Sequence, residues 1–182
     1  HELILSFSIE RINKSGAKFD IEKGKWFNQQ YLKNVTDRVL GDAFLQKLHQ
    51  EGIVIPEDKA AAICGLLKER VTFPHEFWSS GQYFFKAPDH YDEKVIKKRW
   101  NDEVKLVLKE FSEALHDQDQ VDAHIALKTL KDVLEKNGVG MGKVMQVLRV
   151  VLTGVGGGPD LMGIIAVLGK DEVVQRINEA LK

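Results

Sequence analysis

Apolar residues recur at helical spacing along most of the chain. Between residues 94 and 116 they form one stripe of an α-helix, at Trp100, Val104, Val107, Leu108, Phe111 and Leu115. The same period predicts further helices over residues 21–32, 39–48, 60–67, 77–85, 121–134, 161–168 and 174–181. No segment keeps up the strict alternation that is typical of a half-buried strand, so we expect an all-α fold.

Glycine, proline and acidic residues punctuate these helices. Residues 144–152 are apolar almost all round, which predicts a buried central helix, and the glycine-rich stretch 138–142 separates it from the helix before. Gly169 is placed to end the preceding helix, with Asp171 as a candidate cap for the last one. Pro159 stands just before an apolar stripe, where the missing N–H of proline costs least.

The segment 86–90 is polar and lies between two predicted helices, which makes it the best candidate for a boundary. We therefore expect two helical-bundle subdomains, over residues 35–90 and 91–182, preceded by a short helical stub over residues 1–34. No internal repeat or low-complexity tract interrupts this organisation.

The composition is that of an ordinary globular protein. The 182 residues carry 26 Lys and Arg against 27 Asp and Glu, a formal net charge of -1. This balance excludes a histone-like basic chain but leaves room for a local basic patch that binds nucleic acid. The single cysteine, Cys64, excludes a disulfide scaffold and an all-cysteine zinc site. No apolar stretch approaches the roughly 20 residues of a membrane helix, and the chain opens at His1 without a signal peptide, so we expect a piece of a longer cytoplasmic protein.

The residues offer no convincing catalytic, metal or cofactor site. Residues 138–143 resemble the end of a phosphate-binding loop, but Asn137 and Val144 stand where its first glycine and its Ser or Thr belong. Residues 154–159 begin like a dinucleotide-binding fingerprint, but Pro159 replaces its third glycine and the stretch follows a helix. The six histidines do not pair with one another, or with the cysteine, at metal-ligand spacing. We expect no catalytic residue, metal ligand or cofactor in this chain.

Arg149 is the one charge within the apolar run from Val147 to Leu152. An unpaired buried charge is costly, so its guanidinium must reach an acid, the solvent, or an anionic or aromatic ligand. An internal ion pair, or a side chain that extends to water, is the alternative to a binding role.

A glycine-rich loop, residues 153–159, joins the helix of Arg149 to the next one. Its glycines let other groups approach the backbone, and the following helix presents unpaired N–H donors at its start. Such a concave, donor-rich surface with a cation beside it could hold the edges of unstacked bases. The alternatives are a plain connector, or an apolar groove beside Gly154–Gly158 that makes the chain a helical protein-interaction module with no RNA role.

Two blocks of the sequence resemble bacterial glutamyl-tRNA synthetases. The first, Phe7–Asp20 continued by Lys25–Leu32, is similar to the region just after the catalytic core of those enzymes. The second, Gly142–Gly154 continued in pieces to Lys170, is similar to their end. The blocks stand in the order of the family, and residues 40–135 match it mainly in helical character.

The resemblance implies an all-helical cage that reads the tRNA anticodon, with residues 1–34 as the remnant of a stem-contact domain. The parent would be a class I ligase that joins glutamate to tRNA(Glu) with ATP and magnesium. The motifs that form the adenylate in that family are missing from this sequence, so we expect the fragment itself to be catalytically silent. The implied partner is tRNA(Glu), bound by a monomer without DNA or a membrane.

Residue by residue, Arg149 matches the arginine that contacts anticodon bases, and Gln146 matches a polar position that faces the same bases. Gly158, Pro159 and Leu161 match the positions where the loop and the next helix contact the RNA. A glycine at position 158 can contribute only its backbone, whereas Pro159 and Leu161 are expected to offer apolar surface to a base.

Two further residues are candidates for contacts with the tRNA. The family also reads the third anticodon base with the first helical subdomain. Arg70 is the candidate for that contact because it is basic and ends an apolar helix. Thr153 is the other candidate because it opens the loop that follows the helix of Arg149.

Overall fold

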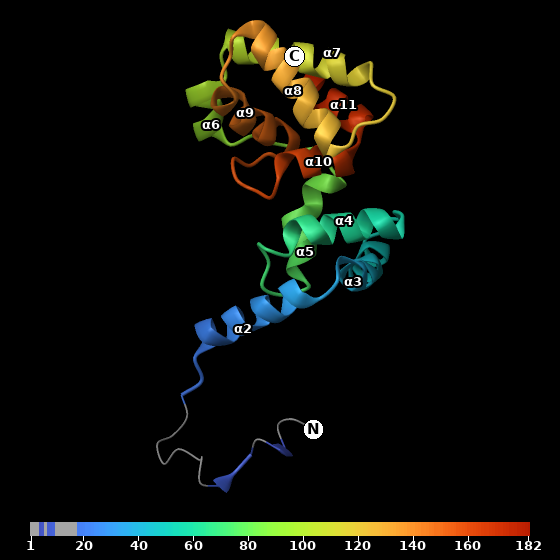
Figure 1. Ribbon diagram of the computed structural model, residues 1–182, viewed down its shortest axis with the longest axis vertical. Coiled ribbons are helices and arrows are strands. Elements are labelled where there is room, and N and C mark those ends of the chain that lie inside the picture. Colours follow the sequence, from blue (N-terminus) through green and yellow to red (C-terminus); the bar gives the residue numbers. More distant parts are fainter. Residues whose placement is uncertain (1–3, 6, 10–17) are drawn as a thin grey trace.

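The computed structural model describes residues 4–5, 7–9 and 18–182 of the chain. Within residues 18–182 every regular element is a helix, which confirms the expected all-α fold (Figure 1). The elements are α2 (Ile21–Asn34), α3 (Asp37–Gln50), α4 (Glu57–Leu67), α5 (Glu76–Gly81), the 3-10 helix η2 (Gln82–Phe84), α6 (Glu93–Arg99), α7 (Asp102–His116), α8 (Ala123–Asn137), α9 (Met141–Thr153), α10 (Leu161–Leu168) and α11 (Lys170–Ala180). None of the helices in the described ranges is both long and apolar enough to cross a membrane.

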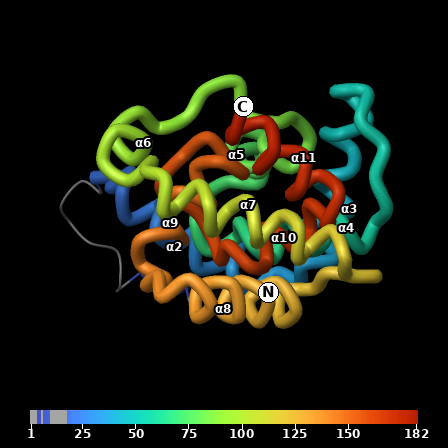
Figure 2. The backbone as a smooth tube through the Cα atoms, turned by 90° about the horizontal axis from the view of Figure 1, so that it is seen from above, coloured from blue at the N-terminus to red at the C-terminus, as the bar shows by residue number. Residues whose placement is uncertain are grey.

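The helices form two groups, which Figure 1 shows one above the other. The elements from α2 to η2 make the lower group and those from α6 to α11 the upper group. α10 packs on α4, and both α9 and α10 contact η2, so the two groups meet along these elements. Seen from above, α3 and α6 lie at opposite ends of the molecule (Figure 2). The polar segment 86–90 lies in the connection between η2 and α6, as the sequence predicts.

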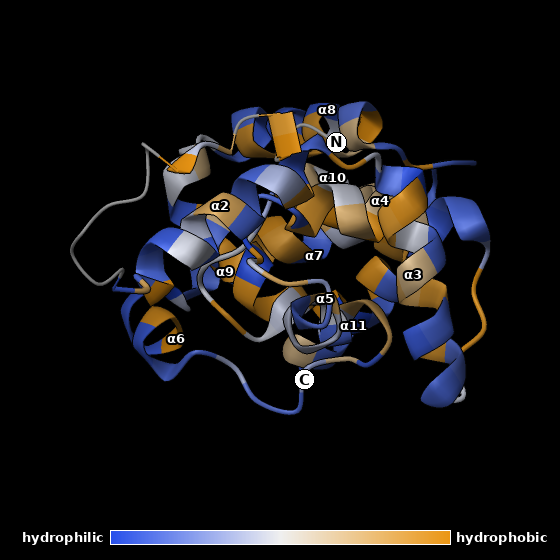
Figure 3. Cartoon of the chain, turned by 90° about the horizontal axis from the view of Figure 1, so that it is seen from below, coloured by the Kyte–Doolittle hydropathy of each residue, from blue (hydrophilic) through white to orange (hydrophobic). Residues whose placement is uncertain are grey.

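A single apolar core runs through both groups. Figure 3 shows apolar residues gathered where α7, α9 and α10 meet, with polar residues on the outside. In α9 every residue from Val147 to Leu152 is buried except Arg149, which is half-buried. The predicted central helix is therefore confirmed, and Arg149 is the one residue of this run that is not fully buried in the core.

The stripe between residues 94 and 116 belongs to two helices rather than one. The chain leaves the helical conformation at Trp100, where φ is -80° and ψ is 93°. The side chain of Asn101 then caps α7 by accepting a hydrogen bond from the N–H of Val104 at 2.9 Å. The stripe continues across this break because both helices pack on the same core.

The helix ends near the glycine loop also differ from expectation. The cap of α10 is Asp160, whose carboxylate accepts a hydrogen bond from the N–H of Gly163 at 2.6 Å. Pro159 therefore precedes the cap instead of opening the helix. Gly169 ends α10 as expected, but α11 has no side-chain cap, and Asp171 lies in its first turn, where a negative charge is favoured.

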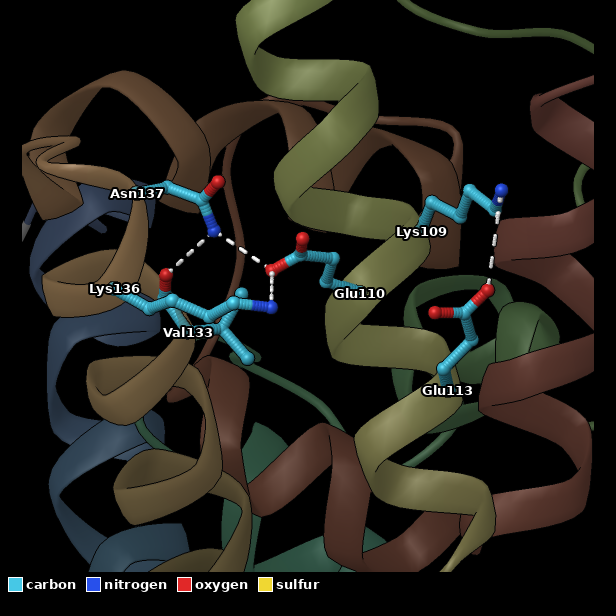
Figure 4. Close-up of polar contacts among 6 residues, drawn as sticks. All are labelled: Lys109, Glu110, Glu113, Val133, Lys136 and Asn137. Carbon is cyan, nitrogen blue, oxygen red and sulfur yellow. Dashed lines mark hydrogen bonds and ion pairs between the residues drawn. The ribbon is translucent and has the colours of Figure 1, made fainter.

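Polar contacts of Glu110 fasten the end of α8 to α7 (Figure 4). The carboxylate of Glu110 accepts hydrogen bonds from Asn137 at 2.8 Å and from Lys136 at 3.0 Å, and Asn137 also donates to the carbonyl of Val133 at 2.9 Å. The hydrogen bonds from Asn137 and Lys136 lower the pKa of Glu110. Because the turn into α9 follows directly at Gly138, this contact helps to fix where α9 begins.

Candidate nucleic-acid interface

Arg149 lies in the last turns of α9, at the point where the helix meets the glycine loop. The helix ends because Gly154 adopts a left-handed conformation with φ of 83°, while its N–H still donates to the carbonyl of Val150 at 2.7 Å. The residues directly before and after Arg149 in the helix, Leu148 and Val150, are buried. The guanidinium is thus carried by a rigid, buried helix to the edge of the core.

The guanidinium of Arg149 faces the loop. A β-carbon built on Gly158 would come within 2.8 Å of its Nη1 atom, so the absence of a side chain at position 158 leaves the space that the guanidinium occupies. This Nη1 atom is buried and has no hydrogen-bond partner. Within residues 18–182 no carboxylate comes within salt-bridge distance of Arg149, so the alternative of an internal ion pair is not realised there. A buried donor without a partner costs about 1–3 kcal/mol.

Arg70, in the other helical group, is near enough to Arg149 for its charge to act on it. It lies on the exposed turn that follows α4, three residues beyond the last helical residue, Leu67. Burial lowers the pKa of Arg149, and the positive charge of Arg70 lowers it further. The charges of two arginines that are far apart in the sequence therefore influence each other in the folded chain.

Two residues that the sequence patterns did not suggest complete the surroundings of Arg149. The hydroxyl of Tyr83, on η2, is buried without a hydrogen-bond partner. Burial raises the pKa of Tyr83 to about 12, against the opposite effect of the charges of Arg149 and Arg70. The carboxylate of Asp160, besides capping α10, raises the pKa of Arg149. Tyr83 stands in an aromatic run that is typical of a core, and a capping aspartate needs no other role, so neither gave a signal in the sequence.

The glycine loop is held in place at both of its sides. Gly154 is packed so closely that a β-carbon would come within 3.0 Å of the carbonyl oxygen of His90, and its own carbonyl accepts a hydrogen bond from the N–H of Asp92 at 2.9 Å. The side-chain amide of Gln146 lies beside Gly156, one helical turn before Arg149 on the same face of α9. Gly157, in contrast, has no other group within 4 Å of a built β-carbon. Gln146 and Arg149 therefore lie at successive positions of the loop, Gln146 beside Gly156 and Arg149 beside Gly158.

Three of the predicted contact residues are buried in the protein: Thr153, Pro159 and Leu161. Pro159 and Leu161 are buried, so the expectation that they offer open apolar surface is wrong for this structure. Leu161 opens α10, whose apolar residues enter the core, and this draws the start of the helix inward. The buried hydroxyl of Thr153 donates to the carbonyl of Arg149 at 2.8 Å and accepts from the N–H of Val155 at 3.4 Å. These residues shape the loop.

The described residues give little support to a metal site, a nucleotide-binding loop or a reactive cysteine. No group of three or more His, Cys, Asp or Glu residues could hold a metal ion in that part of the chain. Gly140 and Gly142 begin α9 after another helix, and the loop 154–159 follows α9, so neither stretch has the strand-to-helix setting of a nucleotide-binding loop. Cys64 is buried, and burial raises the pKa of its thiol to about 12, which makes it unreactive at neutral pH.

Comparisons with known proteins agree with the nucleic-acid interpretation. Residues 24–181 match the family model described as an anticodon binding domain. The chain is 43% identical over 181 residues to the glutamate–tRNA ligase of Cytophaga hutchinsonii and 40% identical over 180 residues to that of Amoebophilus asiaticus, and in both cases 99% of the chain is covered. It is also similar to the crystal structure of a glutamate tRNA ligase from Elizabethkingia meningosepticum in complex with its amino acid, with a TM-score of 0.93, 38% identity and 99% of the chain covered.

The similarity extends over only part of these relatives. The chain spans 35% of the length of the two curated ligases and 36% of the solved one.

Proposed function

The chain belongs to the family of anticodon-binding domains, and we propose that it is the part of a glutamate–tRNA ligase that reads the anticodon of tRNA(Glu). The ligase similarity over nearly the whole chain supports this assignment. The observation that carries the proposal is the half-buried side chain of Arg149, which lies against Gly158 of the glycine loop and has no carboxylate partner among the described residues.

The chemistry of the surface suits unpaired bases. Bases of the anticodon loop are single stranded, so their hydrogen-bonding edges are open to side chains and backbone groups. The planar guanidinium of Arg149 can stack on a base and donate to its edge at the same time. Arg70 supplies a second cation from the other helical group, and we assign it to the third anticodon base.

The other predicted residues take distinct roles in this proposal. Gln146 offers a side-chain amide beside the loop, and Gly158 offers its backbone. Thr153, Pro159 and Leu161 hold the loop and the start of α10 in position, since they are buried in the protein without RNA.

The parent enzyme would attach glutamate to tRNA(Glu) with ATP and magnesium. The described residues fit neither group, because they include no candidate metal cluster and no nucleotide-binding loop. We therefore assign ATP and magnesium to other parts of the parent and no catalytic step to this chain. We also propose that residues 35–90 and 91–182 act as two anticodon-binding subdomains and residues 1–34 as part of a stem-contact domain, in a monomeric cytoplasmic enzyme.

An RNA hairpin that carries the anticodon stem and loop of tRNA(Glu) tests the proposal directly. The 182-residue chain is expected to bind this hairpin more tightly than hairpins with one anticodon base replaced, with about 1–3 kcal/mol lost per contacted base. Arg149→Ala is expected to remove that preference while the helical content stays unchanged. Equal binding of all hairpins would contradict the proposal and favour the protein-interaction alternative.

A further inference from the structure

Arg176 of α11 is a charged side chain inside the protein, with an exposed fraction of only 2%. All three nitrogens of its guanidinium are engaged. Nε and Nη2 contact one carboxylate oxygen of Glu172 at 2.7 and 2.6 Å, while Nη1 donates to the carbonyl of Leu152 at 2.5 Å and to the carbonyl of Tyr83 at 2.7 Å. Burying an arginine is costly unless its donors find partners, and here each of the three guanidinium nitrogens has at least one.

The partners of Arg176 belong to both helical groups. Tyr83 lies on η2, in the lower group of Figure 1, and Leu152 lies in the last turn of α9, in the upper group. The carbonyl of Leu152 is one of those that a helix end leaves without an internal partner, so Arg176 also completes the end of α9. One nitrogen atom thus joins the two groups at a point between Tyr83 and the start of the glycine loop.

Both joined segments carry groups of the proposed RNA site. Arg176 holds the carbonyl of Tyr83, a residue whose pKa is raised by burial and lowered by the charges of Arg149 and Arg70. Leu152 lies one turn beyond Arg149 and directly before Thr153, which opens the loop. Arg149 and Arg70 repel each other, as the effect of Arg70 on the pKa of Arg149 indicates. The hydrogen bonds of Arg176 add a polar connection to the packing of α10 on α4 that already holds the two groups together.

We infer that Arg176 is a positioning residue for anticodon recognition: by binding the carbonyls of Tyr83 and Leu152 it fixes the spacing between the arginine of the lower group and the arginine of α9. This inference rests on the proposed function. Arg176 itself does not touch RNA in it, because its donors are used and the side chain is buried. Its effect is to let both guanidinium groups meet their bases at once.

The first test needs no RNA. Arg176→Met removes the hydrogen bonds and keeps an unbranched apolar side chain, and amide hydrogen exchange then reports on the joined segments. The amides of Phe85 and Gly154, which close the turns at these segments, are expected to exchange about tenfold faster, whereas the amides of α3 keep their rates. Unchanged exchange at Phe85 and Gly154 would overturn the inference.

Two further variants keep the test decisive. Arg99→Met is the matched control, since Arg99 also donates to a carbonyl of α9, that of Gly142 at 2.8 Å, but at the far end of the helix. It is expected to leave both readouts unchanged. If Arg176→Met does not fold, Arg176→Lys replaces it, because lysine keeps the charge but cannot reach both carbonyls and Glu172 together.

The second test measures selectivity among the hairpins. In the folded Arg176 variant the preference for the glutamate anticodon over a base-substituted one is expected to fall about tenfold, whereas a merely less stable protein would lose affinity for all hairpins equally. Faster exchange with an unchanged preference would overturn the positioning role. If the wild-type chain shows no preference, the proposed function fails, while the exchange result still decides whether Arg176 joins the two groups.

Discussion

The Nη1 atom of Arg149 lies against the backbone of Gly158, in the space that a side chain at position 158 would fill. The two residues lie on different segments, α9 and the loop that follows it. Their proximity determines where the unpaired donor of Arg149 points, and several measurements can examine this relationship and the surface around it.

Gly158→Ala is expected to weaken binding of the glutamate-anticodon hairpin about threefold to tenfold, because the new β-carbon displaces the guanidinium from its position. Gly157→Ala is the matched control in the same loop, since nothing lies within 4 Å of its β-carbon. Binding titrations of both variants measure the difference. Equal affinities would contradict the importance of the Arg149–Gly158 contact.

Arg149→Met is expected to weaken hairpin binding about tenfold to a hundredfold and yet to raise the free energy of unfolding by about 1 kcal/mol. The gain in stability arises because the substitution removes a buried donor without a partner and relieves the repulsion from Arg70. Urea denaturation and hairpin titration on the same samples provide both values. A loss of both stability and binding would indicate that Arg149 serves the fold instead.

Gly163→Ala is expected to destabilise the junction of α10 and α4. A β-carbon there would come within 2.5 Å of the side chain of Leu66, so the two helices must separate or Leu66 must change rotamer. Gly142→Ala, with nothing within 4 Å, is the control. The Gly163 variant should be less stable than the Gly142 variant by about 1–3 kcal/mol in thermal or urea denaturation.

Stability is expected to fall in acid partly through Glu76. Its carboxylate accepts hydrogen bonds from the N–H groups of Thr72 at 2.6 Å and Phe73 at 3.2 Å, and the bond from Thr72 is the main reason that its pKa lies below the usual 4.5. A lowered pKa in the folded state means that the ionised form stabilises the fold above pH 4.5 and that this contribution disappears as the pH falls through the lowered value.

Glu76→Gln tests this contribution. The variant should be less stable than the wild type by about 1 kcal/mol at pH 7, because the hydrogen bonds lose their charge. Since Glu76 is half-exposed, solvent screening keeps the effect small. The difference should shrink in urea denaturation as the pH falls from 4.5 through the lowered pKa, because the carboxylate is protonated over this range. A difference that is constant over this range would rule out the assignment.

The helices were predictable because their signals are local. The stripes of α7, α9 and α10 follow the i, i+3 and i+4 spacing, and the structure confirms each of them. The break at Trp100 was missed because one apolar stripe continues across it, while only the side chain of Asn101 marks the new helix. A cap of this kind is a single residue, and a periodic pattern gives it little weight.

Parts of the site were less predictable. Arg149 stood out as a charge in an apolar run, and the glycines beside it indicated a close approach to the backbone. Tyr83 gave no signal, and Arg176, which contacts a carbonyl 93 residues away, gave none either. The resemblance places Leu161 at a position that contacts RNA, but the residue is buried, because the sequence does not reveal which side of a short apolar helix faces the core.

The sequence by itself determined the all-helical fold, the buried course of α9 and the presence of a lone arginine next to a glycine loop. These features depend on side chains within one or two helical turns of each other. The tertiary structure alone decided that the guanidinium faces Gly158 without a carboxylate partner among the described residues, and that Arg70 and Tyr83 join it. Hydrogen bonds and charge interactions of this kind depend on distances between segments far apart in the chain, which arise only when the helices pack.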